Sequence, residues 1–432
     1  MNEINPGGRV YQAPRGTQDL LPEEQPYFAH VEATAGHFAS LYGYQEIRTP
    51  TFEDSALFRR GTGETTDIVE KEMYSFIDKG NADVTLRPEA TPSIMRAYLQ
   101  HGMHARPQPI RLFQIISGFR YDRPQAGRLR EFHQFDCEAI GEDDPALDAE
   151  LITLLWRFCD ALGLHDLSLD INSIGDQACR PGYLEALRAH YEPHHEELCG
   201  DCRRRLSVNP LRLLDCKVPS CQPIADTAPG FTDHLCDACR EHFARVLATL
   251  EAEGIAPTLN RRLVRGLDYY TRTVFELFPP RAGSQSALGG GGRYDGMAEH
   301  LGGRHTPGVG FAAGIERLVL NLKEQNAPVP PTPNAQVYVG HMGGQAESVA
   351  SDFARSLRSR GVSTLRAVGE RSLRARLRHA DAAGVRWTAI FGDEELRDGT
   401  VSLRDMNAKS PETLAFDQAL ERIVSSTQDR TE

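Results

Sequence analysis

Positions 263–270 read LVRGLDYY and bring one arginine close to two adjacent tyrosines. The guanidinium of Arg265 could bind a carboxylate or a phosphate, and the hydroxyls of Tyr269 and Tyr270 could fix the orientation of a polar ring. A strand-like run follows at 273–278. Taken alone, the segment could equally be an aromatic corner of a core, so its meaning depends on the elements around it.

Two alternating runs within 111–141, separated by a stretch rich in Pro, Gly and Arg, predict a hairpin with a long loop. Successive side chains of a strand point to opposite faces, so the returning run has a polar face and an apolar face. Phe135, Cys137 and Ala139 lie on the apolar face, and the polar face carries Phe132, Gln134, Asp136 and Glu138. If the strands pair simply, Arg120 joins Gln134 and Glu138 in one pocket. A half-solvated sheet is the alternative.

The loop of this hairpin contains three more arginines, Arg123, Arg128 and Arg130. Guanidinium groups bind phosphates through two parallel hydrogen bonds, so such a loop suits a ligand with several phosphates. A solvated turn with scattered charge is the alternative.

Positions 86–91 read LRPEAT and are followed by an apolar helical pattern. Glu89 and Thr91 therefore lie at a strand-to-helix junction. Glu89 could bind an ammonium group or pair with a nearby arginine. Thr91 could line the same site or simply cap the helix.

Two glycine-rich segments follow. Positions 289–296 read GGGGRYDG, which would let a ligand approach the backbone closely or would form a flexible hairpin tip. Positions 308–320 read GVGFAAGIERLVL and predict a strand leading into a helix, with Arg317 off its apolar stripe. Arg317 could be solvated, or it could contact a base or a phosphate. The chain has no GxxxxGK[ST] loop and the wrong glycine spacing for a dinucleotide fingerprint, which disfavours the parallel-sheet nucleotide folds.

The composition is that of a globular protein, with 40% hydrophobic and 25% charged residues in a chain of 432. That length predicts two or three domains. No apolar run is long enough to span a membrane and positions 1–15 do not resemble a signal peptide, so we expect a cytoplasmic protein. The net charge of −12 argues against coating nucleic acid, although the segment from Ala335 onward is balanced, with fourteen basic and fourteen acidic residues.

The proline-rich run at 323–334 indicates a linker, which we place at 325–334. Beyond it, strand-like runs at 337–339 and 389–391 and a helical pattern at 346–360 predict a small βαβ domain with a mostly parallel sheet. We therefore expect an α+β domain at 1–324, built on an antiparallel sheet and carrying a helical insertion at about 179–262. A C-terminal α/β domain would occupy 335–432.

The insertion holds two CxxC pairs with two further cysteines between them. The four paired residues are Cys199, Cys202, Cys236 and Cys239, and the two between are Cys216 and Cys221. Paired thiols in a reducing compartment suit tetrahedral zinc better than disulfides. However, 33 residues separate the two pairs and six thiols are too many for one site, so we assign no metal.

Taken together, these segments resemble class II aminoacyl-tRNA synthetases. The arginine-bearing hairpin resembles their motif 2, the Gly-to-Glu-Arg helix resembles motif 3, and Pro50 resembles the motif 1 proline, which implies a homodimer. The histidine-specific family is the most similar, because LVRGLDYY and GGRYDG resemble its two signatures and positions 13–22 resemble its N-terminal segment. The C-terminal part resembles its anticodon-binding domain.

This resemblance implies a site for L-histidine and a site for ATP with Mg²⁺. The histidine pocket would comprise Glu89, Ala90, Thr91, Arg120, Gln134, Glu138, Arg265, Tyr269 and Tyr270. Glu89 and Gln134 would hold the amino and carboxylate ends, and Glu138 with a tyrosine would read the imidazole. Arg265 and Arg120 would be the catalytic electrostatic groups.

For ATP, the resemblance places Arg120 on the α-phosphate, Arg128 toward the outer phosphates, and Phe132 and Arg317 on the two faces of adenine. Asp122 occupies a position where the family usually has Glu, so its carboxylate is shorter by one methylene. Arg123 and Gln125 of the loop would face tRNA. In the C-terminal domain, a basic stripe opposite Leu373 and Leu377 would also contact tRNA or simply be solvated. It comprises Arg371, Arg374 and Arg378.

The activity implied is the formation of histidyl-adenylate and pyrophosphate, followed by transfer of histidine to the 3′ end of tRNA(His). One alternative is a catalytically silent regulatory subunit of ATP phosphoribosyltransferase, a family that resembles the catalytic domain but lacks the anticodon domain. Another is a class II enzyme with a different amino acid specificity.

Overall fold

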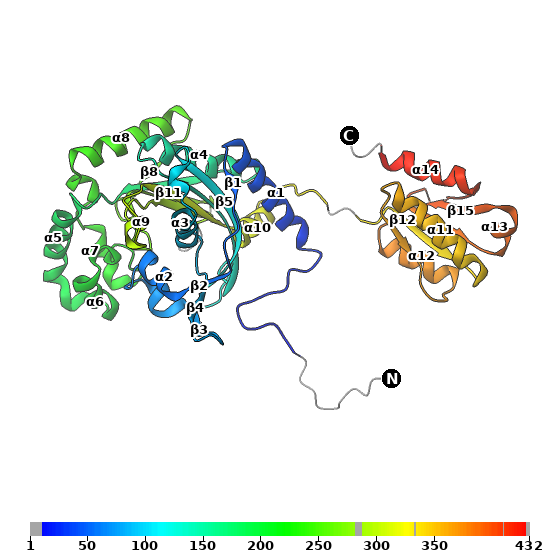
Figure 1. Ribbon diagram of the computed structural model, residues 1–432, viewed down its shortest axis with the longest axis horizontal. Helices are drawn as coiled ribbons and strands as arrows, with labels where there is room; N and C mark the ends of the chain where they lie inside the picture. The colour runs from blue at the N-terminus through cyan, green and yellow to red at the C-terminus, as the bar shows by residue number, and fades with distance from the viewer. Residues whose placement is uncertain (1–10, 281–286, 332–333, 409, 429–432) are drawn as a thin grey trace. The chain divides into compact units, whose positions relative to one another are not determined.

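The computed structural model describes residues 11–280, 287–331, 334–408 and 410–428. The chain divides into two compact units, 1–330 and 331–432, and each is described by itself (Figure 1). Positions 1–10 of the N-terminal stretch and positions 332–333 of the predicted linker lie outside the described residues. Within the described ranges, no helix combines the length and apolar character that a membrane span requires.

The first unit is built on an eight-stranded sheet with the order β1-β5-β6-β11-β10-β9-β7-β8. Its six central strands are antiparallel, as predicted, whereas the two-residue edge strands β1 and β8 pair in parallel. The sheet is therefore mixed. The strands are β1 (Gln45–Glu46), β5 (Ile110–Phe119), β6 (Glu131–Ile140), β7 (Ser168–Ser173), β8 (Thr258–Leu259), β9 (Thr271–Phe278), β10 (Gly289–Arg293) and β11 (Gly308–Gly314).

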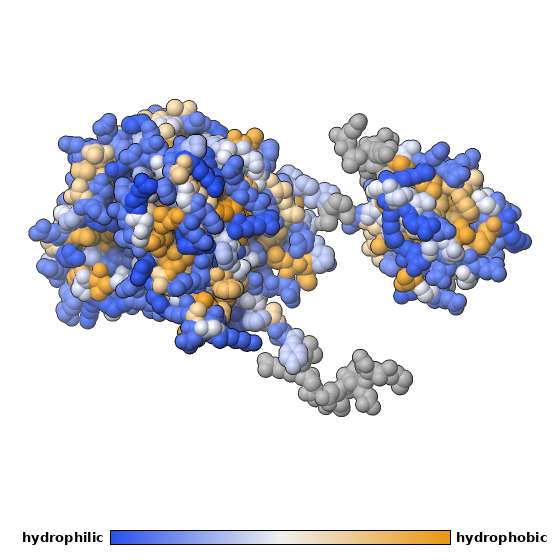
Figure 2. Space-filling view, in the orientation of Figure 1, coloured by the Kyte–Doolittle hydropathy of each residue, from blue (hydrophilic) through white to orange (hydrophobic). Residues whose placement is uncertain are grey.

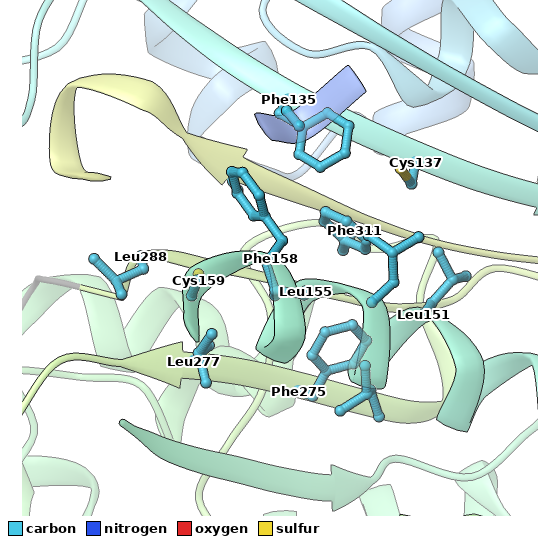
Figure 3. Close-up of a cluster of buried hydrophobic side chains, with 14 of the residues drawn as sticks. Phe135, Cys137, Leu151, Leu155, Phe158, Cys159, Phe275, Leu277, Leu288 and Phe311 are labelled. Atoms are coloured by element: carbon cyan, nitrogen blue, oxygen red, sulfur yellow. The ribbon is translucent and has the colours of Figure 1, made fainter. Parts of the chain in front are cut away.

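Helices α1 (Gln25–Leu41), α4 (Pro145–Ala161) and α10 (Ile315–Glu324) cover the apolar face of this sheet. Phe135 of β6 lies at the centre of the core, with ring centroids 5.2 Å from Phe158 of α4 and 5.5 Å from Phe311 of β11. Figure 3 shows these three rings turned toward one another. Buried aromatic rings contribute strongly to the stability of a core, so this packing fixes the orientation of β6. The polar face of β6 therefore points away from the helices.

A smaller three-stranded sheet, ordered β2-β4-β3, leads into the helices that border the polar face of β6. Its strands are β2 (Phe52–Asp54), β3 (Tyr74–Ile77) and β4 (Asp83–Leu86). The neighbouring helices are α2 (Ser55–Thr62), the π-helix η1 (Ile68–Glu72), α3 (Thr91–Gln100), the 3-10 helix η2 (Met103–Ala105) and α9 (Met297–His300).

The segment between β7 and β8 is helical, as predicted, and consists mostly of short elements. They are α5 (Arg180–Tyr191), η3 (Glu192–Glu197), α6 (Gly200–Val208), η4 (Pro210–Leu213), η5 (Pro219–Cys221), α7 (Gln222–Asp226), η6 (Phe231–His234) and α8 (Asp237–Ala252). The longest, α8, packs against α4 and contributes Phe243, Val246 and Leu250 to the main core. The remaining elements share a core of Tyr183, Tyr191 and several cysteines.

The second unit has one five-stranded sheet, ordered β13-β12-β14-β15-β16. Three strands are parallel and the last two are antiparallel, so the expectation of a mostly parallel sheet is wrong for that half. The reason is the short connection 392–399 between β14 and β15, because a parallel crossover needs a dozen residues or more. The strands are β12 (Val337–His341), β13 (Thr364–Arg366), β14 (Trp387–Phe391), β15 (Thr400–Asp405) and β16 (Ser410–Ala415).

Within the described part of this unit, four helices accompany the sheet: α11 (Gln345–Ser359), α12 (Leu373–Ala382), α13 (Asp393–Asp398) and α14 (Phe416–Gln428). Val337, Val339, Ala389 and Phe391 of the parallel strands are buried among them. Such continuous apolar strands are typical of a parallel sheet covered by helices. Figure 2 shows that hydrophilic side chains dominate the visible surface of each unit.

Candidate functional site

A cavity of about 1090 Å³ opens on the polar face of the main sheet. Most of the predicted site residues line it: Glu89, Thr91, Arg120, Asp122, Arg128, Phe132, Gln134, Arg265, Tyr269, Tyr270 and Arg317. The hairpin β5–β6 pairs in simple register, so the alternation of side chains predicted from the sequence holds. Glu138 and Ala90 lie behind the cavity wall, where both are buried.

Glu138 is a fully enclosed acidic residue of the site, with 1% of its surface exposed. The Thr91 hydroxyl donates to one carboxylate oxygen at 2.6 Å, and the Tyr294 hydroxyl donates to the other. Helix α3 begins at Thr91 with Ala90 as its cap residue, and no side chain caps it. The Thr91 hydroxyl therefore serves the carboxylate and does not cap the helix.

Gly310 of β11 makes room for this carboxylate. The two residues pair across β6 and β11, and an ideal Cβ on Gly310 would lie 1.7 Å from Oε2 of Glu138. No side chain fits there without displacing Glu138. Glycine in the middle of a strand weakens pairing, so it often marks a close approach of another group.

Burial raises the pKa of Glu138 to about 8, because the enclosed carboxylate loses its hydration. The hydrogen bonds from Thr91 and Tyr294 act in the opposite direction and the charge of Glu89 raises the pKa further. The site therefore holds a carboxylate that would gain from a positive partner or an N–H donor.

Glu89 is the second buried acid. It accepts hydrogen bonds from Thr62 at 2.6 Å and from the Tyr269 hydroxyl at 2.8 Å. Burial raises its pKa as well, against the hydrogen bond from Thr62 and the charge of Arg120. Within the described residues it forms no ion pair, so charge pairing with arginine does not explain its position.

Gln134 and Asp136 present buried oxygens to the cavity. Oε1 of Gln134 and Oδ2 of Asp136 accept no hydrogen bond from any described residue. Buried polar atoms are nearly always satisfied, so each is a place for a ligand donor or a water. Burial, with the charges of Glu138 and Glu89, raises the pKa of Asp136 well above its usual range.

Arg265 enters the cavity beside β9 and the glycine-rich strand β10. It forms an ion pair with Glu276 of β9, and its guanidinium carbon lies 5.8 Å from the ring centroid of Tyr270. An ideal Cβ on Gly290 would lie 2.8 Å from Nη1 of Arg265. The glycines of β10 thus lie inside the sheet, not at a hairpin tip, and they leave space for this side chain.

Burial alone would lower the pKa of Arg265, but the charge of Glu276 raises it, so the guanidinium stays positive. Arg265 is therefore a fixed cation on the cavity wall, close enough to Glu89 for its charge to lower the pKa of that carboxyl.

Three arginines form a cationic end of the cavity. Arg120 donates to the carbonyl of Pro88 at 2.8 Å and lies 5.3 Å from the ring centroid of Phe132. Arg317 is half-buried, not solvated, and donates to two backbone carbonyls at 3.1 and 2.8 Å. Burial lowers its pKa, and the nearby charges of Arg128 and Arg120 lower it further. Such mutual repulsion favours a bound anion.

Arg128 pairs with Asp122 across the hairpin loop at 3.1 Å. The shorter carboxylate at position 122 thus holds the loop arginine in place. Arg123 and Gln125 lie on the exposed part of this loop and do not line the cavity.

The basic stripe of the second unit differs from the prediction. Arg374 and Arg378 lie on the exposed face of α12, but Arg371 precedes the helix, which begins after Ser372. Leu373 is exposed, and Arg376 and Ala380 form the buried face instead. The buried face of this helix contains an arginine, and a search for periodic apolar residues does not detect it.

Tyr294, Asp136 and Glu276 line the cavity but were absent from the predicted site. Tyr294 belongs to GGRYDG, so the segment was recognised while its tyrosine was not assigned. Glu276 alternates with the buried Phe275 and Leu277 on β9, and this alternation was the signal that could have found it.

Comparison with known proteins gives consistent matches. A family model described as Histidyl-tRNA synthetase matches residues 16–176 and 227–318, and one described as Anticodon binding domain matches residues 336–426. A histidine–tRNA ligase of Dehalococcoides mccartyi is 51% identical over 411 residues, which cover 95% of this chain and 98% of that protein.

Solved structures agree. An apo histidyl-tRNA synthetase from S. aureus superimposes with a TM-score of 0.81 at 37% identity, covering 96% of this chain and 100% of that one. A Bacillus halodurans protein described as an ATP phosphoribosyltransferase regulatory subunit/histidyl-tRNA synthetase matches with a TM-score of 0.63 at 21% identity, covering 89% and 98%. The latter shares the fold alone. From the matched segments and these identities, the chain belongs to the histidyl-tRNA synthetase family.

Proposed function

We propose that the protein is a histidine–tRNA ligase, which forms histidyl-adenylate from L-histidine and ATP and then transfers histidine to tRNA(His). The observation that carries this proposal is the buried Glu138 carboxylate, fixed by Thr91 and Tyr294 beside a cavity that has an arginine-rich end. One end suits a nitrogen-rich amino acid and the other suits a polyphosphate.

Glu138 accepts an imidazole N–H in this proposal, and Tyr294 holds the carboxylate in place. Glu89 binds the ammonium group, and the side-chain amide of Gln134 meets the carboxylate end. A site built to hydrogen-bond its substrate rejects analogues without those groups by roughly 10⁴- to 10⁵-fold. Such a pocket needs no editing site.

ATP occupies the cationic end. Arg120 contacts the α-phosphate, and adenine lies between Phe132 and Arg317. Arg128 exchanges its Asp122 partner for the outer phosphates. Glu276 lines the cavity beside Arg265 and offers the hard oxygen ligand that Mg²⁺ prefers. Bound Mg²⁺ would neutralise phosphate charge.

In the activation step, one carboxylate oxygen of histidine attacks the α-phosphorus of ATP. The bond from that phosphorus to the bridging oxygen breaks, and pyrophosphate leaves with the electron pair. Charge develops on the phosphoryl oxygens, where Arg120 and Arg265 stabilise it without reorganising. In the second step a hydroxyl of the tRNA 3′ end attacks the carbonyl carbon, and AMP leaves.

The wider assignments also belong to this proposal. A homodimer is supported by apolar side chains exposed on the small sheet next to Pro50: Phe52, Phe76 and Ile77. Contact with tRNA is supported by the exposed loop residues Arg123 and Gln125 and by the C-terminal unit. We place the reaction in the cytoplasm.

Histidine-dependent ATP–pyrophosphate exchange tests the main proposal. We expect exchange with histidine and none above background with the other amino acids, which separates this function from another class II specificity. Charging of tRNA(His) by the same preparation separates it from a silent regulatory subunit. A protein that binds histidine but supports no exchange would contradict the proposal.

A further inference from the structure

The cysteines of the helical insertion form two separate groups, not one. Cys199 and Cys202 lie with Cys216 and Cys221, and their sulfur atoms are all within 4.8 Å of one another. The second CxxC pair belongs elsewhere: its two sulfurs lie with Cys179 and Asp176. The sequence objection that six thiols are too many for one site therefore does not apply.

The sulfur spacing in the first group fits a shared metal ion. Sγ of Cys199 lies 3.9 Å from Sγ of Cys216. A disulfide needs about 2.05 Å, so this pair is not bonded. Four sulfurs at about 2.3 Å from a tetrahedral Zn²⁺ lie about 3.8 Å apart. The observed separation is close to the metal-bound value.

The backbone around this group also suits thiolates. Cys199 is the residue before α6, so the x-x spacing places Cys202 on the first turn of the helix. The backbone N–H of Cys199 donates to Sγ of Cys221 at 3.3 Å. Cys221 ends the three-residue helix η5. Helical elements this short are not stable alone in water, so something else must hold them together.

We propose that Cys199, Cys202, Cys216 and Cys221 bind one structural Zn²⁺ ion that holds residues 199–221 as a wall of the catalytic cavity. Cys199 and Cys216 already line that cavity. The role is structural because all four positions of the tetrahedron are filled by protein ligands, and a catalytic zinc site keeps one position open.

The wall matters because it positions two arginines of the insertion. Arg205 and Arg212 form ion pairs with Asp67 at 3.1 and 3.4 Å. Nη1 of Arg212 also lies 3.4 Å from the Cβ position of Gly266, next to Arg265. The zinc ion would thus fix the backbone that carries Arg205 and Arg212, which pair with Asp67 and approach the residue after Arg265, and its loss would loosen the cavity on that side.

The second group is a weaker candidate. The Asp176 carboxylate accepts a hydrogen bond from the backbone of Ala178 at 2.9 Å and pairs with Arg272 at 3.5 Å. Its oxygens already have partners, whereas the first group offers four thiols. We therefore assign one ion, to the first group.

The test compares two matched serine variants of the full-length protein. Cys199 and Cys236 are both half-buried residues that directly precede a helix and begin a CxxC pair. Each protein is purified without chelator and dialysed, and zinc is measured by mass spectrometry. We expect about one ion per chain in the unchanged protein and in C236S, and less than about 0.3 in C199S.

Cobalt substitution provides a second measurement. It uses the unchanged protein, so its result does not depend on whether a variant folds. Co²⁺ taken up by the chelator-stripped protein should show the intense visible bands of a tetrahedral tetrathiolate site. Less than about 0.2 zinc per chain in the unchanged protein would overturn the proposal. So would an unchanged content in C199S, a loss confined to C236S, equal losses in both variants, or octahedral cobalt spectra.

Discussion

Replacement of Glu138 by Gln separates the charge of the proposed histidine pocket from its shape. Glutamine has the size of glutamate, but it exchanges one acceptor oxygen for an NH₂ donor and removes the negative charge. In the native site both oxygens accept hydroxyl donors, from Thr91 and Tyr294. An imidazole N–H would lose its charged acceptor, and one hydroxyl would have to turn its lone pair toward the amide.

The expected loss follows from these contacts. A hydrogen bond to a charged group contributes about 1.5–3 kcal/mol, and 1.4 kcal/mol is a factor of ten. We therefore expect kcat/KM for histidine in pyrophosphate exchange to fall about 10- to 100-fold in E138Q, with little change in the KM for ATP. E131Q is the control, because Glu131 begins the same strand and is only half-buried, whereas Glu138 is buried against Thr91 and Tyr294.

The thermal stability of E138Q should not fall together with its activity. The pKa of Glu138 is about 8 in the folded protein, above its ordinary value of 4.5. The stabilisation by the protonated form is therefore complete below about pH 4.5 and is lost as pH rises through 8. The neutral amide avoids this loss, so E138Q should melt no lower than the native protein at pH 7. Reduced activity would then not reflect unfolding.

The pH profile is the sharpest readout. kcat/KM reports the ionisation of free enzyme and free substrate. With a pKa of about 8, roughly a tenth of Glu138 is ionised at pH 7 and roughly nine-tenths at pH 9. We expect a limb rising about tenfold between these values in the native protein and in E131Q. The same limb in E138Q, or a kcat/KM within twofold of native, would refute the reasoning.

Three further predictions concern other parts of the molecule. G310A should lower kcat/KM for histidine at least as much as E138Q in the exchange assay, because its Cβ would lie 1.7 Å from the Glu138 carboxylate; near-native activity would contradict this. D148N should lower the free energy of unfolding in urea by about 2–5 kcal/mol at pH 7, because it removes one of the two carboxylates that pair with the buried Arg293 and leaves only Asp295 at 3.3 Å. Burial alone would raise the pKa of Asp148, but Arg293 and a hydrogen bond from His242 lower the pKa to about 2. The stabilisation by the ionised carboxylate is therefore present above pH 3.8 and is lost toward pH 2. A difference in unfolding free energy between the native protein and D148N that stays constant down to pH 2 would contradict this account. Alanine at three basic positions of the C-terminal unit should weaken tRNA binding in filter assays and leave exchange unchanged, and slowed exchange would count against that role. These positions are Arg371, Arg374 and Arg378.

The polar face of the hairpin could be predicted from the sequence because strand alternation is a local property. Gln134 and Glu138 lie where that alternation places them. Tyr294 could not be predicted in this way, because its hydroxyl reaches Glu138 only through the pairing of β6 with β11 and of β11 with β10. That order of strands is set by packing across the whole sheet, which the sequence of one segment does not contain.

The cysteines likewise show that local spacing does not reveal contacts made by tertiary packing. The spacing within each CxxC pair is local and indicates a common site, but the partners of each pair are chosen by the packing of short helices. In the C-terminal unit, the buried Arg376 is likewise invisible to a search for apolar stripes, so the exposed face of α12 was only partly predicted. Local periodicity therefore predicts faces, whereas tertiary packing decides which faces meet.

Electrostatics give the cavity a reason to bind two substrates together. At one end, burial raises the pKa of Glu89 and Glu138, and at the other, burial and neighbouring charges lower the pKa of Arg317. Each end is therefore less favourable empty than with a partner of opposite charge. An amino acid that presents nitrogen groups to the acids and a triphosphate that faces the arginines would relieve both. In the proposed reaction, the free energy spent in folding to hold these groups in place would become binding energy for the reactants, and it would orient the carboxylate of histidine toward the α-phosphorus of ATP.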